Sequence, residues 1–520
     1  MPRLSMLLLA LFITVGCGEP APPIAENRAA LNPDYACDQF GCISLSAFST
    51  AIKNILNGNV VGYAAKVGAL PAVTGGLART ATDSPPSGVA MSTSRNIQIA
   101  SLSKLVTTVA ALQVMNQKIS LDASIAPYLW PSWTQGSNVN KITFRDLLTH
   151  RSGIYSPAST PGGPTGDPCG GSTTDFATLK GIIAGGVPTS QLGTAAYSNC
   201  NFALFRELLP FMLGYRYTGG DDDGQRAAWS MLIYEAYVRQ YVFTPLGFSD
   251  VFCTGVPASD VLAYPYPAGS SSGWDTDFTT ATCGGGGWYL SLDDLALFAN
   301  DLARGNQMLT ALEKADMVSG PLGWDNSVNN CTNPSFCKNG GMTSSSNQQV
   351  NTYLGIVKCN QPVVAVVNSP LPAPYNGPGA ITQLIAAAMK SAAVSQATAP
   401  ATCCDGSAPC GGPGGPCCSS AQTCTAAGTC VANPVCEGIG YPCHSGGDCC
   451  SGMCSNNACA CVHAGGSCAQ GPCCGGYVCS AGVCKVPVVD TCNGRKKPTG
   501  GCSSTWNCCG DDGWECGRCK

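Results

Sequence analysis

The sequence predicts one large α/β (α+β) domain, an antiparallel sheet flanked by helices plus a mostly helical subdomain, followed by small disulfide-rich modules. Three observations lead to this fold class. The chain has 520 residues, more than one compact core usually holds. Of its 35 cysteines, 25 lie between Cys403 and Cys519, a density typical of a disulfide scaffold. The rest of the chain has apolar strand patterns near both of its ends and helical patterns between them.

Composition and charge argue against one class of partner. Only 11% of the residues are charged, and the formal net charge is -4. The chain has no basic run and no interleaving of basic and aromatic residues, so nothing in it favours binding to a phosphate backbone. We expect no nucleic-acid partner.

Residues 1–17 have the pattern of a lipoprotein-type signal peptide. Arg3 precedes an apolar stretch of about a dozen residues, which suits a signal peptide and is too short to span a bilayer as a stable helix. The stretch ends at Cys17 and resembles a bacterial lipobox, although Thr14 stands where leucine is more usual. Acylation of Cys17 leaves 34 cysteines, an even number that can all pair. We expect an exported protein, lipid-anchored to a bacterial outer membrane or cell surface, and otherwise periplasmic or extracellular.

The main domain is predicted to span residues 43–395, after a tether over residues 18–42 that begins with Pro-rich and Ala-rich sequence. Apolar runs predict strands at 60–67, 353–357 and 362–367, the last two joined by a turn. Helical spacing then predicts a C-terminal helix through four apolar positions, Ile381, Leu384, Ile385 and Met389. A sheet formed from both ends of the domain, with a mostly helical insertion, follows from this order.

A linker over residues 396–402 leads to a cysteine-rich part over residues 403–520, where four units each carry a vicinal cysteine pair. The second unit has the clearest spacing, with cysteines at positions 436, 443, 449, 450, 454 and 459. Six cysteines allow 15 connectivities. The spacing resembles the inhibitor-cystine-knot or knottin family, which implies a one-four, two-five, three-six pairing. Zinc is disfavoured because only Cys516 and Cys519 have the C-x-x-C spacing.

Cysteine parity predicts a link between the two parts. The first unit leaves one cysteine over, and the preceding domain holds nine, so one bridge is expected to join them.

The first candidate for chemistry is the segment that ends at Lys104. Ser101 precedes an apolar run typical of a buried helix, so it is expected to open that helix, where free N–H groups stabilise developing negative charge. Lys104 lies three residues on, on the same helical face, and burial lowers a lysine pKa enough for the amine to accept a proton. The alternative is an N-cap serine followed by a surface lysine, which the S-x-x-K pattern alone favours.

Two further segments add polar groups. Tyr197 and Asn199 precede another apolar helix; a tyrosine beside a lysine ammonium can have its pKa lowered enough to act as a base, and an asparagine can hold a substrate amide. Lys338-Asn339-Gly340-Gly341 precedes the late strands, where an edge strand can offer a cation and close backbone approach. Taken alone, the Tyr197–Asn199 segment could be only a turn with a buried aromatic side chain. Taken alone, the Lys338–Gly341 segment is better explained as a polar hairpin loop.

In this order and spacing the three segments resemble the penicillin-recognising serine hydrolases: class C β-lactamases, D-alanyl-D-alanine carboxypeptidases and related esterases. Ile142–Gly153 has that family's I-T-x-R-D-L-L-T-H-x-S-G pattern, and Pro245–Gly247 and Gly286–Ser291 fit later family segments. The resemblance covers about residues 44–392 and implies a β-lactamase/transpeptidase-like fold.

The resemblance also implies roles. Ser101 would be the nucleophile, and Lys104 and Tyr197 would share the base and acid steps. The substrate-binding residues would be Asn199, Lys338, Gly340 and Gly341, with the backbone N–H groups of Ser101 and Gly341 forming the oxyanion hole. No cofactor and no metal is implied.

Two departures from the family pattern concern a substrate carboxylate. Asn339 stands where the K-T-G motif has threonine, and Gly341 where many β-lactamases have serine or threonine. Both are expected to weaken contact with a substrate carboxylate, so hydrolase chemistry is a firmer expectation than antibiotic hydrolysis.

Other polar features are interpreted as structural. Gly269–Gly273 satisfies G-x-S-x-G but lacks the strand and helix that a nucleophile elbow requires. His150 lies upstream of this segment, against the order of that fold, and is expected to be structural. The acidic run Asp221–Asp223 is expected to be a solvated loop, without EF-hand spacing.

Two functions of different classes remain. The first is an exported serine hydrolase acting through an acyl-enzyme on a small-molecule or peptide substrate: a D-amino-acid peptide, a β-lactam or a carboxylic ester. The second is a catalytically inactive surface or binding protein that engages cell-wall material or a surface partner through the cysteine-rich repeats.

Overall fold

The computed structural model describes residues 34–38, 41–116, 118–155, 167–169, 174–220, 222–248, 251, 253, 260–276, 283–325, 336–376 and 379–394, and short strands between residues 422 and 496. The chain divides into two units, and the first contains the large domain. The predicted signal peptide with Cys17, most of the tether, the 396–402 linker and most of the cysteine-rich part lie outside the described residues.

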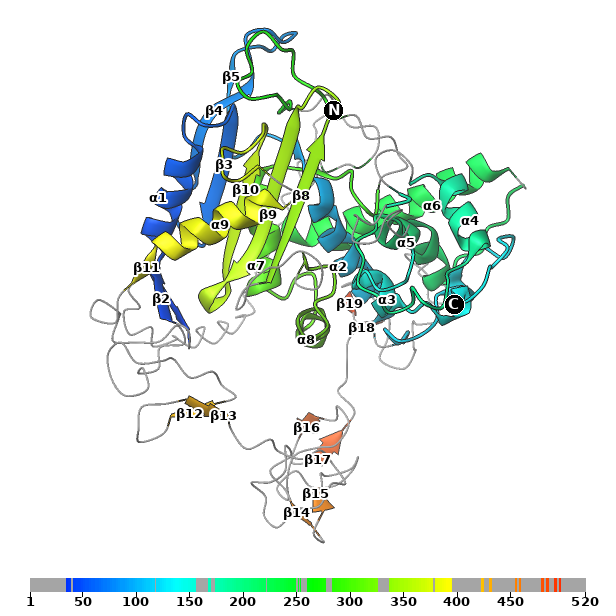
Figure 1. Cartoon of the computed structure of the whole chain (residues 1–520). Coiled ribbons are helices and arrows are strands. Elements are labelled where there is room, and N and C mark those ends of the chain that lie inside the picture. Colours follow the sequence, from blue (N-terminus) through cyan, green and yellow to red (C-terminus); the bar gives the residue numbers. More distant parts are fainter. Residues whose placement is uncertain are drawn as a thin grey trace, which may run out of the picture. The chain divides into compact units, whose positions relative to one another are not determined.

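A six-stranded antiparallel sheet forms the centre of the first unit (Figure 1). Its order is β5-β4-β3-β10-β9-β8, so the strands come from both ends of the domain, as the sequence predicts. The strands are β3 (Gly62–Val67), β4 (Val73–Arg79), β5 (Val89–Ala90), β8 (Phe336–Thr343), β9 (Gln349–Val357) and β10 (Gln361–Val367). The short strands β6 (Ile97–Gln98) and β7 (Tyr289–Leu290) pair separately. β8 is an edge strand, which places the Lys338 segment at the border of the sheet.

Helices cover both faces of this sheet because its central strands are apolar on both sides. Along β10, Val363 and Ala365 join one core with helices α1 (Leu45–Leu56) and α9 (Ala380–Ser391), whereas Val364 and Val366 join the other core with α7 (Leu292–Ala303). Successive side chains of a strand point to opposite faces, which produces this division. The predicted C-terminal helix is therefore present and packs on the sheet.

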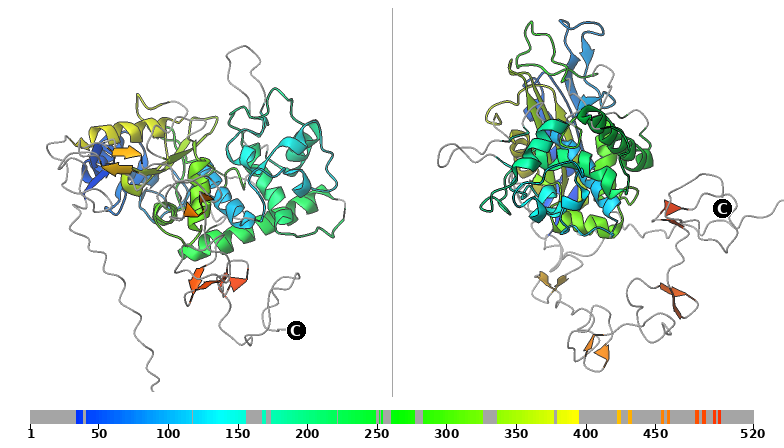
Figure 2. Two further views of the ribbon diagram at one scale, coloured as in Figure 1. Left: turned by 90° about the horizontal axis from the view of Figure 1, so that it is seen from below. Right: turned by 90° about the vertical axis from the view of Figure 1, so that its right-hand side faces the viewer.

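The predicted helical part lies beside the sheet (Figures 1 and 2). Its helices are α2 (Ser103–Met115), α3 (Phe144–Leu148), α4 (Phe176–Gly185), α5 (Cys200–Met212) and α6 (Asp223–Val238), and α8 (Ala311–Ser319) follows α7. α2 and α5 are buried over most of their length, which matches their apolar sequences.

The folded domain begins earlier than the sequence predicts. β1 (Tyr35–Asp38) and β2 (Gly41–Ser44) form a hairpin inside the predicted tether, and β2 also pairs with β11 (Ala393–Val394). These strands are short, and the second partner of β2, the strand β11, lies about 350 residues away in the sequence, beyond the range of local patterns. The first described strand therefore begins at Tyr35, before the predicted boundary at residue 43.

The described residues of the second unit form four short hairpins. They are β12 (Gln422–Cys424) with β13 (Cys430–Ala432), β14 (Cys454–Ser455) with β15 (Ala458–Cys459), β16 (Val478–Ser480) with β17 (Val483–Lys485), and β18 (Thr491–Cys492) with β19 (Arg495–Lys496). In the first three, the last two cysteines of a predicted repeat are paired in the backbone register, for example Cys454 with Cys459. The knottin pairing itself stays a prediction.

Within the described residues, every helix is too short or too polar to cross a bilayer.

Candidate active site

Ser101 lies in a 3₁₀ turn, Ala100–Leu102, that runs directly into α2. The turn is strained, because Ala100 has a φ of 48°, which a residue with a Cβ rarely adopts. The buried Gln98 side chain holds the turn by accepting the N–H of Ala100 at 2.5 Å. Strain that the surroundings enforce in this way is common where a fold presents a functional side chain.

Lys104 is fully buried, and its Nζ contacts three oxygen atoms. Nζ lies 3.2 Å from Ser101 Oγ, 2.7 Å from Asn199 Oδ1 and 2.5 Å from the Gly285 carbonyl oxygen. A neutral amine has two N–H groups and one lone pair. The N–H groups can serve Asn199 and Gly285, which leaves the lone pair to accept the Ser101 proton.

Electrostatics favour that neutral form. Burial holds the pKa of Lys104 well below its usual range, and the nearby Lys338 ammonium lowers this pKa further. The carboxylates of Asp167 and Asp325 oppose the shift without reversing it. This direction agrees with the lowered lysine pKa that the sequence predicts.

Tyr197 is half-buried, and its hydroxyl lies 2.7 Å from Ser101 Oγ and 3.4 Å from Asn199 Oδ1. Its pKa is raised, first by burial and then by the Asp325 carboxylate. The expectation of a lowered tyrosine pKa was therefore wrong. The reason is that burial removes the water that would stabilise a phenolate, and the Asp325 carboxylate disfavours a second negative charge nearby. Tyr197 is a neutral phenol that can donate and accept hydrogen bonds.

His150 packs against the Tyr197 segment, which fits the structural role expected for it. Its ring is buried and stacks on Tyr197 at 4.4 Å between centroids. Nδ1 accepts the backbone N–H of Ser198 at 3.2 Å and lies 3.1 Å from Asn201 Nδ2. Burial holds the pKa of His150 well below its usual range, so the imidazole is neutral. The imidazole ring therefore holds both the Tyr197 ring and the backbone next to it in position.

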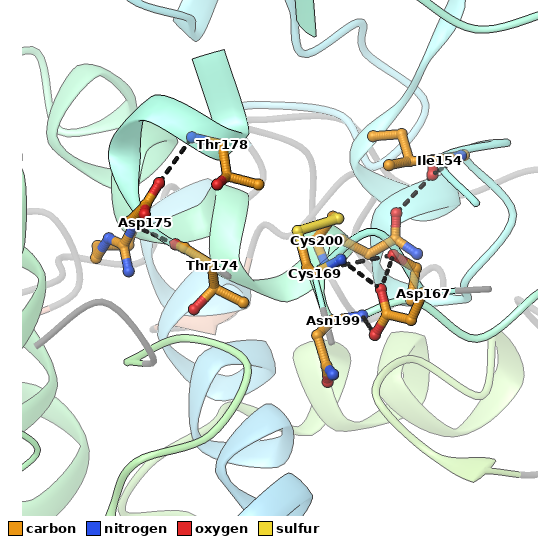
Figure 3. The surroundings of a disulfide bond; sticks show 12 residues. Ile154, Asp167, Cys169, Thr174, Asp175, Thr178, Asn199 and Cys200 are labelled. Atoms are coloured by element: carbon orange, nitrogen blue, oxygen red, sulfur yellow. Dashed lines mark hydrogen bonds between the residues drawn. A yellow bond between two sulfur atoms is a disulfide. The ribbon is translucent and has the colours of Figure 1, made fainter. Parts of the chain in front are cut away.

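A disulfide and a carboxylate fix Asn199 from the other side (Figure 3). Cys169 and Cys200 are bonded to each other. Asp167, two residues before Cys169, accepts the backbone N–H of Asn199 at 2.9 Å and the Ser198 hydroxyl at 2.9 Å. The disulfide therefore joins the segment that carries Asp167 to the start of α5, where Asn199 is the N-cap residue. A second disulfide joins Cys253 and Cys283.

The edge strand β8 brings Lys338 to the same place. Both Lys338 and Asp325 are completely buried, and they form a close ion pair. Asp325 also accepts the backbone N–H of Asn339 at 2.9 Å and its side-chain Nδ2 at 2.8 Å. Lys338 Nζ lies 5.1 Å from the centroid of the Tyr197 ring, over its face. The predicted cation is therefore next to the tyrosine, with its own carboxylate.

Gly340 allows β8 to approach the Ser101 turn. A Cβ on Gly340 would lie 2.8 Å from the Ile99 carbonyl oxygen and 2.9 Å from the Ser101 nitrogen, distances that Cβ atoms do not show. A Cβ on Gly341 would meet its nearest atom at 3.8 Å, an ordinary contact. Gly340 is buried and Gly341 is exposed. The two predicted oxyanion donors, the N–H groups of Ser101 and Gly341, thus belong to adjoining backbone segments.

The remaining candidates are structural in the described residues. The Gly269–Gly273 segment is a loop between the bridged residues Ala263 and Trp274, not a strand-to-helix elbow. Asp222 caps α6, and Asp223 pairs with Lys180. No cluster that could hold a metal ion occurs among residues that the structure describes.

Three residues of this site were missed by the sequence analysis: Asp325, Asp167 and Gln98. None lies in a recognisable motif, and each acts on a residue that is distant in sequence or in an unusual backbone geometry. The sequence offers one signal: Gln98 lies between two apolar residues, Ile97 and Ile99, which indicates that its polar side chain is buried.

The comparisons with known proteins assign the large domain to a family. The family model described as Beta-lactamase matches residues 51–369, more than half of the chain, so the chain belongs to the Beta-lactamase family. This membership supports a serine hydrolase. A search of the curated proteins gives no match.

Several solved structures are similar to this chain. A class C β-lactamase from Rhodobacter sphaeroides has 17% identity and a TM-score of 0.46, covering 66% of this chain and 99% of its own. A β-lactamase/D-alanine carboxypeptidase from Yersinia pestis, complexed with citrate, has 20% identity and a TM-score of 0.47, with coverage of 66% and 99%. A D-stereospecific amidohydrolase from Streptomyces sp. has 17% identity and a TM-score of 0.45, with coverage of 66% and 98%.

Proposed function

We propose that this chain is an exported serine hydrolase that forms an acyl-enzyme on Ser101 and then hydrolyses it, with an amide or an ester as substrate. D-amino-acid peptides, β-lactams and carboxylic esters all contain a carbonyl group that this chemistry attacks. The observation that carries the proposal is the buried Lys104 amine, 3.2 Å from Ser101 Oγ with its other two contacts already accounted for.

The proposed reaction has two halves. Lys104 takes the Ser101 proton as Oγ attacks the substrate carbonyl, and the oxyanion lies at the backbone N–H groups of Ser101 and Gly341. The proton then passes to the leaving group through the Tyr197 hydroxyl, and the bond to the leaving group breaks. Water next attacks the ester on Ser101; its proton returns through the same groups to Oγ, and the acid is released.

The roles of Lys104 and Tyr197 follow from their pKa directions. The lowered pKa of Lys104 makes it the proton acceptor at neutral pH. The raised pKa of Tyr197 keeps its proton on oxygen, so it can relay a proton but does not store a negative charge. Asn199 orients both, since its Oδ1 contacts Lys104 and Tyr197.

An intact-mass time course tests the proposal. The purified chain is mixed with benzylpenicillin or with p-nitrophenyl acetate, and Ser101→Ala is the matched control. We expect an acyl adduct on the wild type alone, and loss of ester hydrolysis by several orders of magnitude in Ser101→Ala. A lasting penicillin adduct indicates a carboxypeptidase type, a transient adduct with drug consumption a β-lactamase, and ester turnover alone an esterase or amidase.

The competing function is an inactive surface protein that acts through the cysteine-rich repeats. It predicts no adduct with either reagent and no effect of Ser101→Ala. The proposal assigns no ligand to the repeats. Each disulfide stabilises a small folded unit by roughly 2 to 5 kcal/mol, which is sufficient reason for the high cysteine content. Export, and the lipid on Cys17, belong to the proposal on the pattern of residues 1–17.

A further inference from the structure

The ion pair beside the nucleophile points to a class of substrate. We infer that Asp325 neutralises Lys338 and so makes the site selective for esters or amides that carry no carboxylate near the scissile bond. The inference rests on the proposed acyl-enzyme chemistry and narrows its substrate.

Asp325 already engages the donors that the resemblance assigns to a substrate carboxylate. Its Oδ1 pairs with Lys338, and its Oδ2 accepts both the backbone N–H and the side-chain amide of Asn339. The two charged side chains have no exposed surface. A substrate carboxylate could therefore bind Lys338 only by displacing a carboxylate that is already desolvated and held by three donors, and breaking a buried pair is costly.

Asn339 reinforces this arrangement. Its amide group points to Asp325, and also lies 3.4 Å from Thr382 Oγ1 on α9. Because the Asn339 amide group donates to Asp325, that N–H is not available to a ligand. The substitution of asparagine for the family's threonine thus belongs to the same internal network as the ion pair.

The charge balance around Ser101 acts in the same direction. The charged groups that act on Lys104 are Lys338, Asp167 and Asp325. Asp167 and Asp325 contribute two negative charges against the one positive charge of Lys338, and the lowered pKa of Lys104 favours its uncharged form. An anionic substrate that approaches Ser101 meets a net negative charge, which disfavours it in a partly desolvated site.

The test compares two thioesters that differ in charge at one position: hippuryl thioglycolate, which carries a carboxylate on its leaving group, and its methyl ester, which is neutral and one methyl group larger. Thiol release gives kcat/KM for the purified full-length chain at pH 6.5. We expect the neutral thioester to be preferred by about tenfold or more. Mono-p-nitrophenyl glutarate and its methyl ester give the same comparison on the acyl side.

Asp325→Asn removes the charge and keeps the shape. It is expected to shift the preference by about tenfold or more toward the carboxylate substrates, because Lys338 then lacks a counter-ion. Asp122→Asn, which removes one negative charge from an exposed pair with Arg145, is the matched control and should leave the preference unchanged. Asn339→Thr keeps the carboxylate, so a smaller shift is expected.

The outcomes separate this inference from the proposed function. Ser101-dependent turnover with a wild-type preference for the carboxylate substrates, or with a preference that Asp325→Asn does not move, overturns the inference and leaves the proposed function intact. If no thioester is turned over, the proposed function fails only if, in addition, neither benzylpenicillin nor p-nitrophenyl acetate gives a Ser101-dependent adduct. If an adduct forms but no thioester is turned over, calorimetric binding of phenylboronic acid against 3-carboxyphenylboronic acid decides the inference: equal or tighter binding of the carboxylated compound overturns it.

Discussion

Gly340→Ala is the substitution whose effect the structure predicts most directly. The added methyl group would lie 2.8 Å from the Ile99 carbonyl oxygen and 2.9 Å from the Ser101 nitrogen, and it would also meet Thr352 Oγ1. Thr352 itself donates to the Ile99 carbonyl at 2.9 Å, so neither neighbour can simply turn away. Ordinary contacts would require β8 and the Ser101 turn to separate by roughly half an ångström or more.

That displacement acts on the atoms that react. A shift of about 1 Å in an active site costs roughly 100-fold in rate, so a tenfold to 100-fold loss in kcat/KM is expected here, equivalent to about 1.4 to 2.7 kcal/mol. Overpacking should also lower the free energy of unfolding by about 1 to 3 kcal/mol.

The assay is initial-rate hydrolysis of p-nitrophenyl acetate, with urea denaturation of the same preparations. Gly341→Ala is the matched variant, because its methyl group meets nothing nearer than 3.8 Å, and its loss should be several-fold smaller than that of Gly340→Ala. If Gly340→Ala retains wild-type kcat/KM and stability, the close approach of β8 to Ser101 is not what the site depends on.

Two further predictions concern proton transfer and the disulfide beside Asn199. Because the pKa of Lys104 is lowered, kcat/KM should rise with pH through that lowered pKa and level off well below about pH 10.4, the ordinary lysine pKa. The raised pKa of Tyr197 should add no fall in kcat/KM on the alkaline side. A rise in kcat/KM confined to pH values above about 10 would contradict the role of Lys104. Replacing Cys169 and Cys200 by alanine opens a loop of 31 residues, for which the chain-entropy relation gives about 3 to 4 kcal/mol of lost stability by urea denaturation. Ester hydrolysis should fall as well, since Asp167 would no longer be held against the backbone of Asn199; full activity in a folded double variant would show that Asp167 does not position this residue.

Much of the fold followed from local sequence patterns. The apolar runs at 60–67 and 362–367 became β3 and β10, and the helical spacing of Ile381 and Leu384 became α9. These predictions succeeded because strands and helices that are buried on a sheet leave a periodic apolar pattern. The hairpin of β1 and β2 was missed because four-residue strands leave too little pattern, and their pairing with β11 depends on the opposite end of the domain.

For the candidate site, the sequence by itself determined which groups were available and that Ser101 and Lys104, three residues apart, share one helical face. It also determined that Tyr197 and Asn199 precede a second buried helix. Tertiary structure decided their protonation and their surroundings. The pKa of Tyr197 rises because packing buries its hydroxyl and brings the Asp325 carboxylate near it. Lys338 gains a buried counter-ion because the fold brings Asp325 to it. Such effects depend on burial and on distances between segments remote in the chain, which no local spacing encodes.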